Sequence, residues 1–167
     1  LLDDAAAMRQ AGPTRLAAAL VQGRAALLDI AQAWRAQLDP TMRVPRTPEL
    51  NLPLWELGHI GWFEAWWLAR NPQRRRGLDC DPDAARAPGD GPDDDALFDS
   101  SRIAHADRWR ATLPDWDTTL ARLAEGRDRT LRLLADTPDD DVACYLPRLV
   151  LFHEDMHREA WLYMSQT

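Results

Sequence analysis

The chain has 167 residues, of which 46% are hydrophobic, and its 20 basic and 27 acidic side chains give a formal net charge of −7. This length and apolar content predict one domain with a buried core. The acidic balance argues against nucleic acid or an anionic membrane as a partner, and no apolar run is long enough to cross a bilayer. Two cysteines, Cys80 and Cys144, are too few for a disulfide framework, so we predict a cytoplasmic protein.

The first half of the sequence predicts two long helices. Apolar residues recur at spacings of three and four from Pro13 to Asp39, where Asp39-Pro40 ends the helix. Three prolines then predict an extended connector over residues 39–50. A second helix is predicted from Asn51, as its N-cap, to Asn71-Pro72. This helix is apolar on most sides and holds four of the eight tryptophans. We therefore predict that it is buried on most sides or packs on a second domain. In a simple bundle, Trp67 would lack a packing partner.

The segment 71–99 has a different composition. It contains four prolines, eight aspartates and four arginines, which predicts a long loop. Two interpretations stay open: a solvated crossover connection, or a loop that reaches over a functional site.

The second half predicts two more helices, at about residues 115–135 and 142–165. Arg127 falls within the apolar stripe of the third helix, where snorkelling to solvent is the usual outcome and a buried ion pair or a substrate anion contact is the alternative. No segment alternates apolar and polar residues as a β-strand does. The sequence therefore predicts an all-α four-helix bundle with one long crossover loop.

Three of the four histidines lie on predicted core-facing stripes. His153 and His157 are one turn apart on the fourth helix, and His59 lies on the second helix within an apolar stripe. Buried imidazoles need partners, and three of them in this pattern predict a metal site, for which Fe, Zn, Ni or Cu is suited. His105 has no matching pattern and is predicted to lie at the surface.

Few carboxylates can join these histidines on one ion. Glu154 and Glu159 point roughly 100° and 200° away from their neighbouring histidines, so Glu56 is the only near candidate. Residues 153–157 read His-Glu-Asp-Met-His, which matches the H-E-x-x-H motif of zinc proteases, but the predicted all-α setting and the missing downstream ligand argue against a protease. The expected ligand set is three neutral histidines with open coordination positions.

Two segments resemble a known family. Asn51-x-Pro53-x-Trp55-x-Leu57-x-His59, followed by Trp62-Phe63-Glu64, is similar to the first histidine segment of the ergothioneine-biosynthesis sulfoxide synthases. His153-x-x-x-His157-x-Glu159 resembles their iron motif. The similarity spans most of the chain and corresponds to their N-terminal DinB-like four-helix domain. Leu97-Phe98-Asp99-Ser100-Ser101-Arg102 looks closest to the selenoneine synthases within that group.

The resemblance implies a non-heme Fe(II) site on His59, His153 and His157. It implies O₂-dependent joining of selenium or sulfur to the imidazole of hercynine, with a selenosugar, cysteine or γ-glutamylcysteine as the donor. It also implies a C-terminal domain, absent from this chain, that carries the catalytic tyrosine, so no catalytic residue is assigned here. Met156 stands where these enzymes commonly have a glutamine that binds the substrate imidazole, and with Arg127 it is a candidate substrate-binding residue.

Two other functions stay open. A stand-alone DinB-like transferase that depends on a metal and a thiol would use a similar three-histidine bundle. A non-catalytic helical interaction module would keep the histidines only as core residues.

Overall fold

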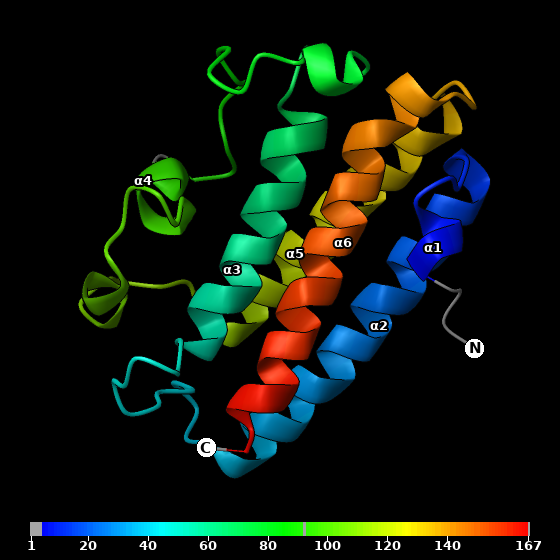
Figure 1. Cartoon of the computed structure of the whole chain (residues 1–167). Coiled ribbons are helices and arrows are strands. Elements are labelled where there is room, and N and C mark those ends of the chain that lie inside the picture. Colours follow the sequence, from blue (N-terminus) through cyan, green and yellow to red (C-terminus); the bar gives the residue numbers. More distant parts are fainter. Residues whose placement is uncertain (1–4, 92, 167) are drawn as a thin grey trace.

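The computed structural model describes residues 5–91 and 93–166, and all of their regular secondary structure is helical (Figure 1). The long helices are α2 (Pro13–Gln37), α3 (Pro53–Glu64), α5 (Trp116–Ala135) and α6 (Asp141–Met164). The short ones are α1 (Ala5–Met8), α4 (Asp94–Phe98), a π-helical turn (Ala65–Ala69) and two 3₁₀ turns (Gly77–Asp79 and His105–Trp109). The all-α prediction is confirmed. The predicted domain limits at residues 1 and 167, and residue 92 of the predicted loop, lie outside the described residues.

Local chemistry explains where the long helices begin. Asp115 and Asp140 cap α5 and α6, since their carboxylates accept hydrogen bonds from backbone N–H groups at 2.8 Å. Helix α3 begins at Pro53 with Leu52 as its N-cap, so the prediction that Asn51 caps it is wrong. The Asn51 amide instead donates a hydrogen bond to Glu56.

The four long helices pack around a core that consists of two apolar parts. Figure 1 shows α6 next to both α3 and α2, with α5 behind α3. One apolar part is built around Leu16, Leu20, Leu68, Leu134 and Val150. The other is built around Leu27, Leu57, Ile60, Leu123 and Trp161. Helices α2, α5 and α6 each contribute to both parts, and α3 does so together with the π-helical turn that follows it. In each case a charged residue lies in the sequence between the two contributions.

These four charged residues form a buried quartet of Arg24, Glu64, Arg127 and Glu154, one on each long helix. Their exposed fractions are only 2–6%. Arg24 donates hydrogen bonds to Glu154 at 2.8 and 3.0 Å and to Glu64 at 2.8 Å. Arg127 contacts the same two carboxylates, with a distance of 3.2 Å to Glu64. Two positive and two negative charges therefore balance within the core.

The quartet corrects one prediction. Arg127 is not extended to solvent but forms the buried ion pairs that were the alternative. Burial alone would raise the pKa of Glu154, but the charges and hydrogen bonds of Arg24 and Arg127 outweigh that effect and lower the pKa. The carboxylate therefore stays ionised inside the bundle.

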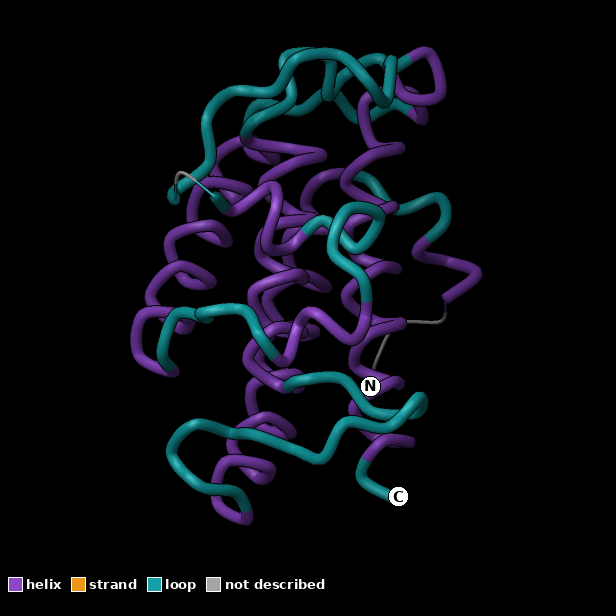
Figure 2. The backbone as a smooth tube through the Cα atoms, turned by 90° about the vertical axis from the view of Figure 1, so that its left-hand side faces the viewer, coloured by secondary structure: helices purple, strands orange, loops and turns teal. Residues whose placement is uncertain are grey.

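The long connection between α3 and α5 is folded against the bundle, and Figure 2 views the molecule from the side that it covers. Arg70 binds the Asp95 carboxylate through both terminal nitrogens, at 2.7 and 2.8 Å. Arg86 lies over the rings of Trp66 and Trp67, at 5.1 and 5.6 Å from their centroids. Trp67 thus has partners within this chain, contrary to the expectation that it lacks one.

The second predicted helix, which contains His59, does not remain α-helical to Asn71 as predicted. The backbone N–H of Arg70 donates to the carbonyl of Ala65 at 2.8 Å, which is the i→i−5 bond of a π-helical turn. Such turns occur often at functional sites.

No helix among the described residues is long and apolar enough to span a membrane. Cys80 and Cys144 are free and buried.

The quartet predicts a large loss of stability when one cation is removed. Arg24→Met leaves two buried carboxylates with Arg127 alone, and we expect the free energy of unfolding to fall by about 3–5 kcal/mol. Urea unfolding followed by circular dichroism measures it.

Arg110→Met is the matched control for this substitution. Arg110 pairs with Asp107 on the surface, with 81% and 53% of the two side chains exposed, and such pairs contribute about 1 kcal/mol at most. Equal effects of the two substitutions would contradict a structural role of the quartet.

Candidate metal centre

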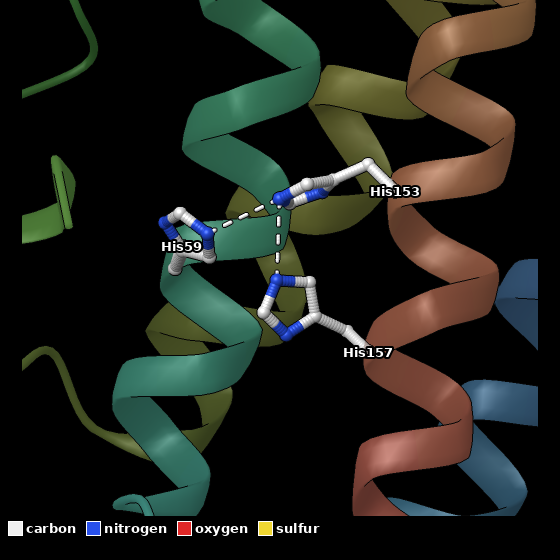
Figure 3. A group of neighbouring side chains, drawn as sticks. All are labelled: His59, His153 and His157. Atoms are coloured by element: carbon white, nitrogen blue, oxygen red, sulfur yellow. Dashed lines mark hydrogen bonds between the residues drawn. The ribbon is translucent and has the colours of Figure 1, made fainter.

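The three core-facing histidines of the sequence meet at one point between α3 and α6 (Figure 3). The Nε2 atom of His153 lies 3.2 Å from Nε2 of His59 and 3.2 Å from Nε2 of His157. One ligand atom from each residue lies within 4.8 Å of the others. The fold therefore brings together residues that are 94 positions apart in the chain.

These distances fit a metal ion. Histidine nitrogens bind such ions at about 2.1 Å, so two of them at an angle of about 90–110° lie roughly 3.0–3.4 Å apart. The donors also fit chemically, because the Nδ1 contacts of His59 and His157 leave the lone pairs of their Nε2 atoms directed at Nε2 of His153, and neutral imidazole nitrogens are common metal ligands. A metal ion would take the place of the hydrogen bonds between these three nitrogens.

A backbone carbonyl orients His59. Its Nδ1 lies 2.8 Å from the carbonyl oxygen of Phe98, at the end of α4. A carbonyl can only accept, so Nδ1 carries the hydrogen and Nε2 carries the free lone pair. The ring also stacks on Trp55, with centroids 4.9 Å apart and an interplanar angle of 8°. The crossover connection thus holds the first histidine in the orientation that a ligand needs.

A carboxylate orients His157. The Oε2 atom of Glu56 lies 2.5 Å from Nδ1 of His157, and the other oxygen accepts a hydrogen bond from the Asn51 amide. The sequence made Glu56 the only near candidate for a further metal ligand. In the structure its carboxylate instead contacts Nδ1 of His157, the ring nitrogen that faces away from the cluster. A carboxylate in this position fixes the tautomer and makes the imidazole a stronger ligand.

His153 is held by stacking. Its ring lies parallel to Phe63, with centroids 3.5 Å apart. Its neighbour Glu154 points away from the cluster into the charged quartet, as the helical angle predicted.

The electrostatics favour neutral histidines. Burial is the main cause that lowers the pKa of His59 to about 4 and that of His153 to about 2, with the charges of neighbouring histidines adding to the effect. Burial would raise the pKa of Glu56, but His157 and Asn51 outweigh it and lower the pKa. At neutral pH a metal therefore displaces no proton from His59 or His153.

The fourth histidine lies elsewhere. His105 was predicted to be at the surface, but it is half-buried and its Nε2 lies 2.8 Å from the carbonyl oxygen of Leu50. It helps to attach the connection that precedes α5 to the segment before α3.

The histidines open onto a cavity of about 680 Å³. Trp55, Trp62, Trp66, Trp67 and Phe63 form its aromatic wall. Asp83 and residues 99–102 of the crossover connection also line it, which favours a loop that reaches over the site. Of the two candidate substrate-binding residues, Met156 lines this cavity and is 52% exposed, whereas Arg127 lies in the charged quartet and does not line it.

Fold and cluster together define a helical-bundle protein with a possible three-histidine metal site. The chain belongs to the DinB superfamily, whose family model matches residues 19–165. No curated protein matches the sequence.

Two features of the site were not found from the sequence. Arg108 lines the cavity from a 3₁₀ turn, in a segment without periodicity, so no sequence pattern marked it. The Phe98 carbonyl is a backbone group, and its position depends on how the connection folds. The Asn51–Glu56 contact had a weak signal, since both residues fall near the start of the same predicted helix.

We predict that Glu56→Gln weakens metal binding by about 10- to 100-fold, because a neutral amide orients and polarises His157 less well than a carboxylate. Competition with a chromophoric chelator measures the Kd. Glu125→Gln, which changes an exposed carboxylate on α5, is the control and should leave the Kd unchanged. Equal affinities for wild type and Glu56→Gln would show that this carboxylate does not act on the site.

The metal-free protein should lose stability as the pH falls from 7 to 5. The unfolded histidines take up protons near pH 6.5, whereas folded His59 and His153 stay neutral, so each contributes a loss of up to about 1.4 kcal/mol per pH unit below that value. Urea unfolding at pH 7, 6 and 5 tests this. His153→Leu removes one of the two groups and should show a shallower dependence; an unchanged slope would count against the buried neutral state.

Proposed function

We propose that this chain holds the iron of an O₂-dependent enzyme that joins selenium or sulfur to the imidazole of hercynine, as in selenoneine and ergothioneine synthases. The observation that carries the proposal is the cluster of three converging Nε2 atoms that opens onto an aromatic cavity. The sequence motifs around His59 and His153 and the family membership support it.

His59, His153 and His157 would hold the ion. Three neutral ligands leave Fe(II) with its full positive charge and open positions, so it would supply redox chemistry with O₂ and attract a chalcogen anion. Joining the two substrates breaks one imidazole C–H bond and one chalcogen–hydrogen bond and forms the C–Se or C–S bond. O₂ would take up the two electrons and the two protons that are released, either as hydrogen peroxide or as water with the second oxygen atom transferred to the chalcogen.

The chain's own residues would bind and orient hercynine. Tryptophan faces are the best aromatic partners for a quaternary ammonium group, and four tryptophans line the cavity. Met156 can pack against the substrate imidazole but accepts a hydrogen bond only weakly. We further propose that a second domain of the same enzyme covers the open side of the cavity, where Met156 is exposed, and supplies the catalytic acid.

A second candidate is a stand-alone transferase that depends on a metal and a thiol. A three-histidine cluster in a bundle of the DinB superfamily supports this candidate as well. In this case Zn or Ni would occupy the histidines, and O₂ would take no part.

The metal content is the first test. Protein purified without oxygen should carry about one iron per chain, and His153→Ala should lose it because a ligand is removed. His105→Ala is the control, since that side chain lies outside the cluster, and should retain the metal. Elemental analysis measures both, and a wild type that binds no metal would reject both candidate enzymes in favour of a histidine core without a catalytic role.

The reaction distinguishes the two enzymes. The iron-loaded natural gene product should consume O₂ only when hercynine and a selenosugar or thiol are both present, and should form a new C–Se or C–S bond detectable by mass spectrometry. Thiol transfer that proceeds equally well without oxygen would favour the transferase.

A further inference from the structure

Three ring N–H groups of α3 attach the helix to the connection that follows it. They belong to Trp55, His59 and Trp62, which lie on one face of the helix because their spacings are four and three. Each donates a hydrogen bond of 2.8 Å to an acceptor within residues 95–98. The C-terminal end of α4 is therefore attached to α3 at the level of one candidate metal ligand.

Gly58 provides the space that this attachment needs. The side chain of Phe98 is almost completely buried, and its ring packs directly on the backbone of α3 at Gly58. A Cβ atom at position 58 would lie 2.5 Å from Cζ of that ring and closer still to Cε1, whereas carbon atoms in contact are about 3.5–4.0 Å apart. A side chain at this position is therefore incompatible with the observed place of the ring.

The ring of Phe98 has little room to move. It packs in a small buried cluster with Val44, Leu52 and Trp55. Packing in such clusters is dense, so a displaced ring finds no free volume beside its present place. Displacing the ring therefore shifts the backbone of residue 98, whose carbonyl oxygen is the group that orients His59.

The same residue precedes one wall of the histidine cavity. Residues 99–102 follow Phe98 directly and line the cavity. The Asp99 carboxylate accepts hydrogen bonds from the backbone N–H and the hydroxyl of Ser101, at 2.9 and 2.7 Å, and pairs with Arg102 at 3.2 Å. These contacts make the turn one unit, so its position depends on where Phe98 lies.

We propose that Gly58 is a positioning residue of the candidate metal centre: its missing side chain seats Phe98, and this seat sets both the orientation of His59 and the cavity wall at residues 99–102. The inference deepens the proposed function and rests on it for the presence of a metal ion. A metal on Nε2 of neutral His59 requires the hydrogen on Nδ1, where the Phe98 carbonyl accepts it. Metal binding and the attachment of the connection therefore strengthen each other, because coupling between two sites is reciprocal.

Gly58→Ala tests the seat, with Zn(II) alone as the probe so that no oxygen chemistry is involved. We expect the affinity for Zn(II) to fall by about 10- to 100-fold, as for other groups that orient a metal ligand, measured by competition with a chromophoric chelator. Nitrogen-15 shifts of His59 in the metal-free protein should show the hydrogen on Nδ1 in the wild type and a mixture of the two tautomers in the variant. Alanine is a better helix former than glycine, so a loss would not come from helix propensity.

Two further variants separate the seat from a general effect on the helix. In Gly61→Ala the new Cβ atom would meet the Leu123 side chain of α5 at 2.9 Å rather than the connection, so the Zn(II) affinity should stay at the wild-type value. Phe98→Leu removes Cε1 and Cζ, the two ring atoms nearest to Gly58, and keeps the backbone carbonyl. Combined with Gly58→Ala, it should therefore restore most of the lost affinity and the Nδ1–H tautomer of His59.

Hydrogen exchange of the wild type tests the reciprocal coupling. Zn(II) should slow the exchange of the backbone amides of residues 96–103, because it favours the attached connection. It should leave unchanged the amides of the 3₁₀ turn Gly77–Asp79, which packs at the start of α6. In Gly58→Ala the slowing at residues 96–103 should be lost.

The proposal is overturned if the wild type binds Zn(II) and Gly58→Ala binds it equally well with the His59 tautomer unchanged, if Phe98→Leu restores nothing, or if Zn(II) leaves the exchange of residues 96–103 unchanged. Those results would leave the three-histidine site and the proposed function intact. A wild type that binds neither Zn(II) nor iron would instead reject the metal centre itself, and the role of Gly58 with it. If Gly58→Ala does not fold alone, the double variant and the wild-type exchange decide between these results.

Discussion

The ion-pair quartet at the centre of the bundle is the interaction on which the rest of the structure depends. Arg24, Glu64, Arg127 and Glu154 come from four different helical segments and lie between the two apolar parts of the core. An apolar contact tolerates rotation of a helix, but a buried ion pair does not, since a rotated helix would leave a charge without a partner. The quartet therefore fixes the rotation of every long helix that it joins.

The candidate metal centre follows from this constraint. Because Glu154 pairs within the quartet, one face of α6 points toward it. His153 lies about 100° around the helix from Glu154 and therefore faces α3 together with His157. Each imidazole is fixed by a different device: the Phe98 carbonyl, the Glu56 carboxylate and the Phe63 ring. The site is thus preorganised by groups from α3 and from the crossover connection, while the positive charges of Arg24 and Arg127 lie in the quartet, on the face of α6 that carries Glu154.

The sequence predicted the parts of the molecule that depend on local periodicity. Apolar spacing located the long helices to within a few residues, and the same spacing placed His59, His153 and His157 on core-facing stripes. It did not predict the partners of Arg127, because an ion pair between helices depends on how the helices are aligned. The same reason applies to Glu56, where the sequence suggested proximity to the cluster but not which imidazole nitrogen it would contact.

The crossover connection was the least predictable part. Its prolines and aspartates indicated a loop, yet Arg70 and Arg86 attach it to the end of the α3 segment, and Trp67 packs inside the chain as a result. Single contacts of this kind leave no periodic signal, and Arg108 was missed for that reason.

X-ray absorption at the iron edge tests the central claim most directly, namely that His59, His153 and His157 bind one metal ion through Nε2. The account predicts about three imidazole nitrogens at roughly 2.1 Å in the wild type, and one fewer in His59→Ala. A spectrum without imidazole scattering, or one that is unchanged by this substitution, would contradict it.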